Sequence, residues 1–361
     1  MRDVVILGAG MAGMACARTL LQQGHRPLVV APRHAIASRG ETLSFRAAPF
    51  LDKLGWQDLL DSEAAVPCQG RYSVWGHAAL RRDPQHEDAS GWHVDRRLFE
   101  TRMADTLAAD GLERLDSEAR RLSRSSSQVA VELADGSSIA ARFLVDCTGR
   151  AAVSAGTISP PRRLDRLVAC YGVFALDDDV EAIPATLVEA VEDGWWYMTI
   201  MPARRCLLCF FTDSDLLPAG IRKDASLWAG MTAQTGAIAA RLDSLGLHAA
   251  ACGELLFAPA SSVTMSHLVE HRVIRAGDAA SALDPLGANG LATALWSGIQ
   301  AAESVVGALA GDDTASRHYE QKFLEGITSF LITQRAMYAS ERRFAGAPFW
   351  MRRSGAPGPA S

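Results

Sequence analysis

The sequence predicts an α/β fold in which an antiparallel sheet is inserted into a doubly wound parallel sheet. Three observations lead to this prediction. A strand, a glycine turn, a helix and a second strand occupy the first 31 residues, consecutive strand-like runs occupy about 165–215, and a buried strand with two long helices follows from about 271. Alternating strands and helices are typical of a parallel sheet, whereas consecutive strands are typical of an antiparallel one.

The chain opens with a short buried strand at 3–8, a helix at 11–23 that ends at Gly24, and a second buried strand at 26–31. The turn before the helix has the pattern G-x-G-x-x-G and comprises Gly8, Ala9, Gly10, Met11, Ala12 and Gly13. Such glycines permit a tight turn and let a pyrophosphate approach the backbone at the helix N-terminus. The turn therefore predicts a nucleotide site, with a tight packing turn as the alternative.

One part of a nucleotide site is absent from the sequence. The acid that holds the ribose hydroxyls is expected about 20 residues after the turn, but Ala31 and Pro32 occupy that place. Arg33 follows, and it could contact a phosphate or stack on adenine. A solvated loop arginine is the equal alternative for Arg33.

The next elements carry their own start and stop signals. Residues 47–56 have the pattern of a short amphipathic helix with a glycine stop, and Asp95 is placed to cap a helix that Gly111 terminates. Residues 128–146 alternate, turn at Asp135-Gly136 and return, which predicts a hairpin.

From about 165 to 215 the strand-like runs follow one another, with a turn at Asp193-Gly194, and predict the antiparallel sheet. A single helix is expected at roughly 224–245. A buried strand at 271–278 and helices at about 288–310 and 314–340 complete the fold, and the tail at 354–361 is expected to be disordered.

A second nucleotide signature lies at 275–302. Asp278 comes at the carboxyl end of a predicted strand, in the crevice where α/β sheets bind ligands, and its carboxylate can accept hydrogen bonds from a polyol. The helix that begins near Gly290 points its N-terminus at the expected ligand space. The partial positive charge of a helix N-terminus suits an anionic ring there. A capping aspartate before an ordinary helix is the alternative, but it leaves the glycine-proline loop between strand and helix unexplained.

The composition excludes several classes of protein. A net charge of −5 argues against a nucleic-acid surface, and no apolar run reaches the roughly 18–20 residues of a membrane span. Seven scattered cysteines predict a reducing, cytoplasmic location. Cys206 and Cys209 form a C-x-x-C, but on a strand they would point to opposite faces, so we expect core thiols and no metal site.

Further motifs give the chain a resemblance to the flavoprotein monooxygenase superfamily, which includes para-hydroxybenzoate-hydroxylase-type enzymes, tryptophan halogenases and geranylgeranyl reductases. The resemblance covers nearly the whole chain. Besides the glycine turn it rests on AGDAA at 276–280, DPLGANG at 284–290, RGETL at 39–43, HVDRRLFE at 93–100 and FLVDCTGR at 143–150.

The resemblance implies a Rossmann-type domain that binds FAD non-covalently. The glycine turn would hold the ADP half, Asp278 the ribitol and Arg96 the phosphates. The full set of implied FAD-binding residues is Gly8, Gly10, Met11, Ala12, Gly13, Arg33, Glu41, Thr42, Arg96, Gly277, Asp278, Gly287, Asn289 and Gly290. The implied FAD domain comprises 1–70, 93–160 and 262–330, the substrate-binding antiparallel domain comprises 71–92 and 161–261, and a C-terminal helix and tail occupy 331–361.

A narrower resemblance points to a halogenase-like subgroup that includes the flavoproteins which mature tryptophylquinone cofactors. It rests on SVWG at 73–76, GWHVDR at 91–96, GWWY at 194–197 and ERRFAGAPFWMRR at 341–353. It implies a monooxygenase that takes electrons transiently from NAD(P)H and hydroxylates an indole-like ring through a flavin C4a-hydroperoxide. The substrate would be a free aromatic molecule or a tryptophan-containing polypeptide. Halogenation is not expected, because 69–80, where halogenases place a lysine, contains none.

Two sets of residues are candidates for the chemistry. His93 and Asp284 lie in flavin-adjacent motifs and could manage protons, although a packed or capping histidine is the alternative for His93. Trp75, Trp195, Trp196 and Tyr197 could form the wall of an aromatic-accepting pocket, with ordinary sheet packing as the alternative.

Two other functions stay open on the sequence alone. One is a flavin-dependent reductase or dehydrogenase of the isoprenoid-reductase type, which would insert no oxygen. The other is a decayed flavin fold that serves as a binding partner, an alternative that Ala31 motivates.

Overall fold

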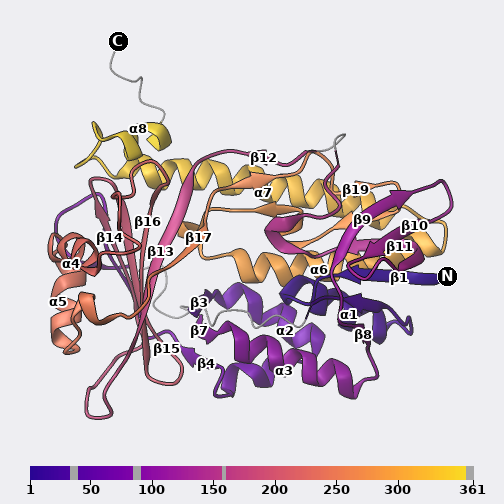
Figure 1. Ribbon diagram of the computed structural model, residues 1–361, viewed down its shortest axis with the longest axis horizontal. Coiled ribbons are helices and arrows are strands. Elements are labelled where there is room, and N and C mark those ends of the chain that lie inside the picture. Colours follow the sequence, from indigo (N-terminus) through magenta and orange to yellow (C-terminus); the bar gives the residue numbers. More distant parts are fainter. Residues whose placement is uncertain (33–39, 84–90, 157–159, 355–361) are drawn as a thin grey trace, which may run out of the picture.

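Figure 1 shows the computed structural model, which describes residues 1–32, 40–83, 91–156 and 160–354. The predictions for Arg33 and for the tail beyond Ser354 lie outside these residues. In the view of Figure 1 the parallel sheet lies on the right and the antiparallel sheet on the left, and helix α7 (Thr314–Ser340) runs along the top of both.

The parallel sheet forms as predicted. Its main path has the order β19-β20-β11-β1-β2-β8, with β1 parallel to both β2 and β11. The hairpin that turns at Asp135-Gly136 extends it through β10 and β9. The strands are β1 (Arg2–Leu7), β2 (Leu28–Val30), β8 (Glu113–Leu115), β9 (Ala119–Arg124), β10 (Val129–Leu133), β11 (Ser138–Asp146), β19 (Val269–Glu270) and β20 (Val273–Arg275).

The two faces of this sheet are buried differently. On β1, Val4 and Ile6 pack into a core with helices α1, α3 and α6, while Val5 and Leu7 pack with residues of β10 on the other face. This is the period-2 alternation of a strand buried on both sides. The helices that contribute to the core on the first face are α1 (Met11–Gln22), α2 (Ala48–Leu54), α3 (Arg96–Ala109), α6 (Gly290–Leu309) and α7.

The second sheet has the predicted antiparallel hairpins, in the order β17-β13-β16-β15-β14-β5-β6 within the described ranges. Only β14 and β5 pair in parallel among them. The strands are β5 (Arg71–Val74), β6 (Arg81–Arg82), β13 (Leu167–Ala175), β14 (Thr186–Val191), β15 (Gly194–Met201), β16 (Arg205–Asp213) and β17 (Leu256–Pro259). Two small sheets connect the two large ones. The first contains β3 (Gly40–Leu43), β7 (Trp92–Asp95) and β4 (Ala65–Pro67). The second contains β12 (Arg162–Arg163), β18 (Val263–Thr264) and β21 (Ser281–Ala282).

The prediction of one helix at 224–245 is wrong. The segment forms two helices, α4 (Ala225–Ala233) and α5 (Ala237–Ser244). The buried carboxylate of Glu189 on β14 explains the break, because it accepts hydrogen bonds from the backbone N–H groups of Gly236 (2.7 Å) and Ile238 (2.8 Å). A carboxylate at this point caps a new helix N-terminus.

The described part of the chain ends in a short helix that was not predicted separately, α8 (Pro348–Ser354). It is fixed to the antiparallel sheet, since Trp350 donates to the carbonyl of Val191 and Arg353 pairs with the buried Asp213 at 2.6 Å. The C-terminal segment therefore belongs to the packing of that sheet. None of the helices in the described parts of the chain is long and apolar enough to cross a membrane.

Candidate active site

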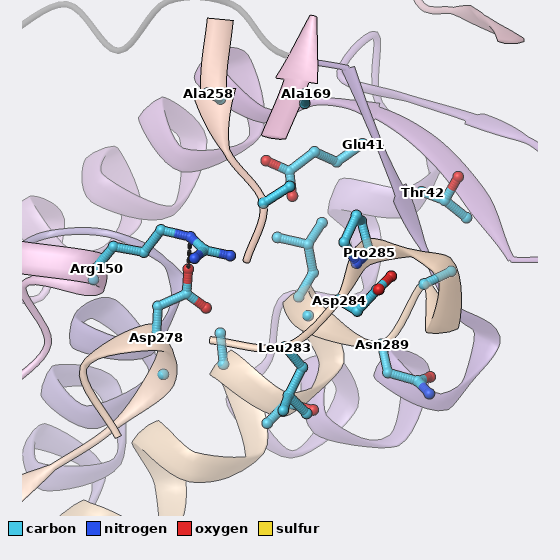
Figure 2. Close-up of a pocket in the computed structure, with 18 of the residues that line it drawn as sticks. Glu41, Thr42, Arg150, Ala169, Ala258, Asp278, Leu283, Asp284, Pro285 and Asn289 are labelled. Carbon is cyan, nitrogen blue, oxygen red and sulfur yellow. Dashed lines mark ion pairs between the residues drawn. The ribbon is translucent and has the colours of Figure 1, made fainter. Parts of the chain in front are cut away.

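A cavity of about 340 Å³ lies between the two sheets (Figure 2). Its size is within the range of small-molecule and cofactor sites. At one end are the glycine turn, β3, the end of β20 and the start of α6, and at the other are strands β13, β15, β16 and β17. The predicted residues that line it are Gly10, Met11, Ala12, Glu41, Thr42, Arg96, Trp195, Tyr197, Gly277, Asp278, Asp284, Asn289 and Gly290.

The glycines of the turn have two roles: some allow close packing of the backbone, and one leaves open space in front of the helix. A Cβ on Gly13 would lie 2.0 Å from the carbonyl oxygen of Gly8, and a Cβ on Gly8, whose φ is +98°, would lie 2.3 Å from that of Cys147. A Cβ on Gly10 would instead meet nothing nearer than 3.6 Å. The space in front of Gly10, at the uncapped N-terminus of α1, therefore fits the phosphates of a dinucleotide.

Arg96 enters this space from the start of α3, which the side chain of Asp95 caps as predicted. Its guanidinium pairs with Glu41 at 2.7 Å and with Glu100 at 2.9 Å. Sequence analysis missed Glu100, although its i, i+4 spacing from Arg96 was a signal. Glu100 is buried, which raises the pKa of its carboxyl, and its Oε2 has no hydrogen-bond partner among the described residues.

Asp278 lies where the sequence predicted, directly after β20. Its carboxylate faces the cavity, with 46% of the side chain accessible, and its Oδ2 lies 3.7 Å from the Nε of Arg150 (Figure 2). Desolvation in this hollow raises the pKa of the carboxyl, and Arg150 and Arg96 oppose the rise. The preceding Gly277 has a φ of +61°, and a Cβ there would lie 2.9 Å from that of Ala12.

The loop after Asp284 connects the cavity to α7. Asp284 is almost fully buried, and its carboxylate accepts hydrogen bonds from Leu286 N (2.9 Å), Gln334 Nε2 (2.8 Å) and Tyr338 Oη (2.8 Å). Burial raises the pKa of Asp284, while these donors limit the rise. Gly287 does not line the cavity and instead packs against α7, where a Cβ on it would meet the ring of Phe330 at 2.6 Å.

Two of the predicted aromatic residues face the cavity from β15. Tyr197 shares a 2.7 Å hydrogen bond between its hydroxyl and that of Thr42. Trp195 stacks on Phe211 with ring centroids 4.0 Å apart, and its Nε1 donates to the hydroxyl of Tyr338 at 3.1 Å. A chain of hydrogen bonds thus runs from Trp195 through Tyr338 to Asp284.

Three of the six residues predicted for the chemistry do not line the cavity. Trp196 points to the opposite face of β15 and packs on Phe210 and Trp228, as strand alternation requires. Trp75 packs on Trp350 and donates to the carbonyl of Met337. His93 is fully buried, its Nδ1 lies 2.6 Å from Thr199 Oγ1, and burial lowers its pKa to about 3, which matches the packed histidine that sequence analysis left as the alternative.

The cysteines behave as core thiols. Cys206 and Cys209 lie in separate cores on opposite faces of β16, as predicted. All seven cysteines fall within the described ranges, and each is a buried free thiol.

Comparison with known proteins identifies the family. Residues 1–322 match the family described as FAD binding domain. The chain belongs to this family of FAD-dependent oxidoreductases. The fit of its residues agrees: an open glycine turn with Arg96 for the phosphates, Asp278 for a polyol, and a helix N-terminus beyond Asn289 for the flavin edge.

This chain is similar to individual proteins over most of their length. The chain is 25% identical to LodB of Marinomonas mediterranea, named as an FAD-dependent oxidoreductase, over 97% of this chain and 96% of that protein. It is 28% identical to QhpG, a peptidyl tryptophan dihydroxylase essential for tryptophylquinone cofactor biogenesis, with a TM-score of 0.81 over 100% of this chain and 80% of that one. The flavin-dependent halogenase CmlS has the same fold at 21% identity, with a TM-score of 0.81 over 100% and 68% of the two chains.

Proposed function

We propose that this FAD-dependent oxidoreductase is a monooxygenase that hydroxylates a tryptophan-type ring carried by a polypeptide, with NAD(P)H as the reductant and O₂ as the oxygen source. One observation carries the proposal. A single cavity joins the residues that fit FAD to an apolar wall of aromatic and small side chains on the antiparallel sheet. FAD, when bound, supplies the redox chemistry and the activation of oxygen, and the protein supplies position and electrostatics.

The wall is suited to a flat ring. The stacked pair of Trp195 and Phe211 gives a fixed aromatic surface, on which a second ring can lie offset or edge-on. Small side chains at Ala169, Ala258 and Cys209 leave room beside it. The other apolar wall residues are Tyr171, Leu207, Ala260, Leu283 and Phe330.

We assign a role to each polar group near the wall. We infer that Asp284 holds or accepts a proton at its carboxylate, because it is buried beside the flavin-facing loop and tied to Tyr338. The Thr42–Tyr197 hydrogen bond fixes the wall against the β3 side of the cavity. The apolar surroundings exclude water, which would otherwise divert the reactive flavin.

Similarity to QhpG supports a polypeptide as the carrier of the ring, since that protein acts on peptidyl tryptophan and matches the full length of this chain. The lysines support a hydroxylase over a halogenase. None of the three, Lys53, Lys223 and Lys322, lines the cavity, and Lys53 and Lys322 pair with surface glutamates.

Stopped-flow reduction of the FAD-loaded protein by NADH or NADPH tests the proposal. We expect slow reduction with free tryptophan and faster reduction when a tryptophan-containing polypeptide is present. The same polypeptide with tryptophan replaced by phenylalanine is the matched control. If a small free aromatic alone gives fast reduction and oxygen insertion, the substrate is not peptidyl; a brominated product in the presence of bromide would overturn the argument from the lysines.

A further inference from the structure

Arg150 lines the cavity, and neither the motifs nor the family assignment gives it a task. It lies in a short 3₁₀ turn (Gly149–Ala151) that follows the carboxyl end of β11. Its Nη1 donates to the carbonyl of Ser261 at 2.6 Å, and its Nε lies 3.7 Å from Asp278 Oδ2. Figure 2 shows the side chain reaching across the cavity toward Asp278.

The ion pair with Asp278 is a loose one. At 3.7 Å it is longer than a charge-assisted hydrogen bond, which is typically about 2.7–2.9 Å. The Ser261 carbonyl, by contrast, holds the opposite side of the guanidinium firmly. Arg150 is therefore anchored through Nη1, and its long contact with Asp278 is one that a nearer anion in the cavity can replace.

The charges around the glycine turn show why a second cation is needed. Arg96 contributes +1, while Glu41, Glu100 and Asp278 contribute up to −3, so this cluster has a net charge of about −2 when all three are ionised. Including Arg150 brings this cluster to about −1 before any ligand binds. A diphosphate adds roughly two further negative charges, and the guanidinium of Arg150 has a geometry that matches phosphate oxygens.

The end of β2 adds a second reason. Ala31 is buried there and has no side-chain acceptor for the ribose hydroxyls, so this position does not supply the acid that holds them in other sites. A further contact to the diphosphate would offset that loss.

We propose that Arg150 is a second diphosphate-binding residue. When the flavin dinucleotide binds, its guanidinium turns from Asp278 to a diphosphate oxygen, which leaves the Asp278 carboxylate able to accept hydrogen bonds from the ribitol. The inference rests on the assignment of FAD as the cofactor.

Binding of three ligands to the flavin-free protein tests the proposal, measured by calorimetry and by flavin fluorescence. FAD and ADP contain the diphosphate, whereas riboflavin contains no phosphate. Arg150→Gln should weaken FAD and ADP binding ~10–100-fold, the effect of losing a charged hydrogen bond. Riboflavin binding should change less than ~2-fold, and Arg150→Lys should recover part of the FAD affinity.

Arg142→Gln is the matched control, because Arg142 lies on β11, the strand that precedes the turn of Arg150, but pairs with Asp3 at the surface. It should leave all three affinities unchanged. Unchanged FAD binding by Arg150→Gln, or an equal loss of FAD and riboflavin in a variant that melts like the wild type, would overturn the role of Arg150 alone. A wild-type protein that binds no FAD would overturn the cofactor assignment and this inference together.

Discussion

At the scale of single residues, the site depends on two carboxyl groups with unlike exposure. Asp284 is buried, whereas 46% of the Asp278 side chain is accessible, and desolvation raises the pKa of both carboxyls. They differ in their partners. Asp284 accepts hydrogen bonds from fixed donors. Asp278 has a loose ion pair with Arg150, and its carboxylate faces the space where we expect the cofactor.

Tyr338 connects Asp284 to the substrate wall, and its hydroxyl is the point to test. Tyr338→Phe removes a hydrogen bond that stabilises the ionised form of Asp284, so the pKa of Asp284 should rise further. It also leaves the Trp195 Nε1 without its acceptor, which should cost about 1–3 kcal/mol of folding stability. We expect the limb of the pH–rate profile that depends on Asp284 to move to higher pH.

Tyr319→Phe is the control for this variant. Tyr319 is also buried, but its hydroxyl donates to the carbonyl of Arg275, whereas that of Tyr338 donates to Asp284. Chemical denaturation should show that both variants lose stability. Only Tyr338→Phe should shift the pH profile, and an equal shift in the two would argue against a positioning role for Tyr338.

The raised pKa of Asp278 gives a prediction for stability against pH. A carboxyl whose pKa is higher in the folded than in the unfolded protein contributes most below its unfolded value of about 3.9, and this contribution is lost as pH rises through the folded value. Asp278→Asn has no carboxyl to ionise at this position, so it does not lose this stability as pH rises. The flavin-free variant should therefore melt at a higher temperature than wild type at pH 7, the difference should shrink toward pH 4, and FAD affinity should fall.

Thermal melting of both proteins over that pH range checks the prediction. A variant less stable than wild type at pH 7 would show that the ion pair with Arg150 outweighs the desolvation of Asp278.

At the scale of elements, local signals in the sequence identified most helices and strands, and long-range contacts explain the rest. The glycine turn, the Asp95 cap and the Asp135-Gly136 hairpin each depend on neighbouring residues and were predicted. The break between α4 and α5 depends on Glu189, about 47 residues away in sequence, and was missed. Trp196 was placed in the pocket although alternation along β15 already excludes it from the face of Trp195.

The turn between β1 and α1 offers a paired test of its two kinds of glycine. Gly10→Ala should fold normally, since its Cβ would have only ordinary contacts, but the methyl group would enter the phosphate space and weaken FAD binding. Gly13→Ala should destabilise the protein itself, because its Cβ would lie 2.0 Å from the Gly8 carbonyl oxygen. Melting temperature and FAD titration together distinguish the two, and a Gly10→Ala protein with full FAD affinity would contradict the placement of the phosphates.

At the scale of the whole molecule, the cavity exists because segments far apart in sequence meet. The glycine turn comes from the N-terminus, Arg96 and Arg150 from the middle of the chain, and Phe330 from α7, which also supplies Gln334 and Tyr338 as donors to Asp284. The motif residues were predictable because each lies in a local pattern. Arg150 and Tyr338 were not, since only the packed fold brings them to Asp278 and Asp284.

The central claim is that this cavity directs oxygen into a tryptophan-type ring. The most direct test is turnover of the FAD-loaded protein with NAD(P)H, ¹⁸O₂ and a tryptophan-containing polypeptide, followed by mass spectrometry of the polypeptide. We expect ¹⁸O on the tryptophan residue, and none when Trp is replaced by Phe in the substrate. A polypeptide that is oxidised or reduced without gaining ¹⁸O, or one that gains oxygen only from water, would contradict it.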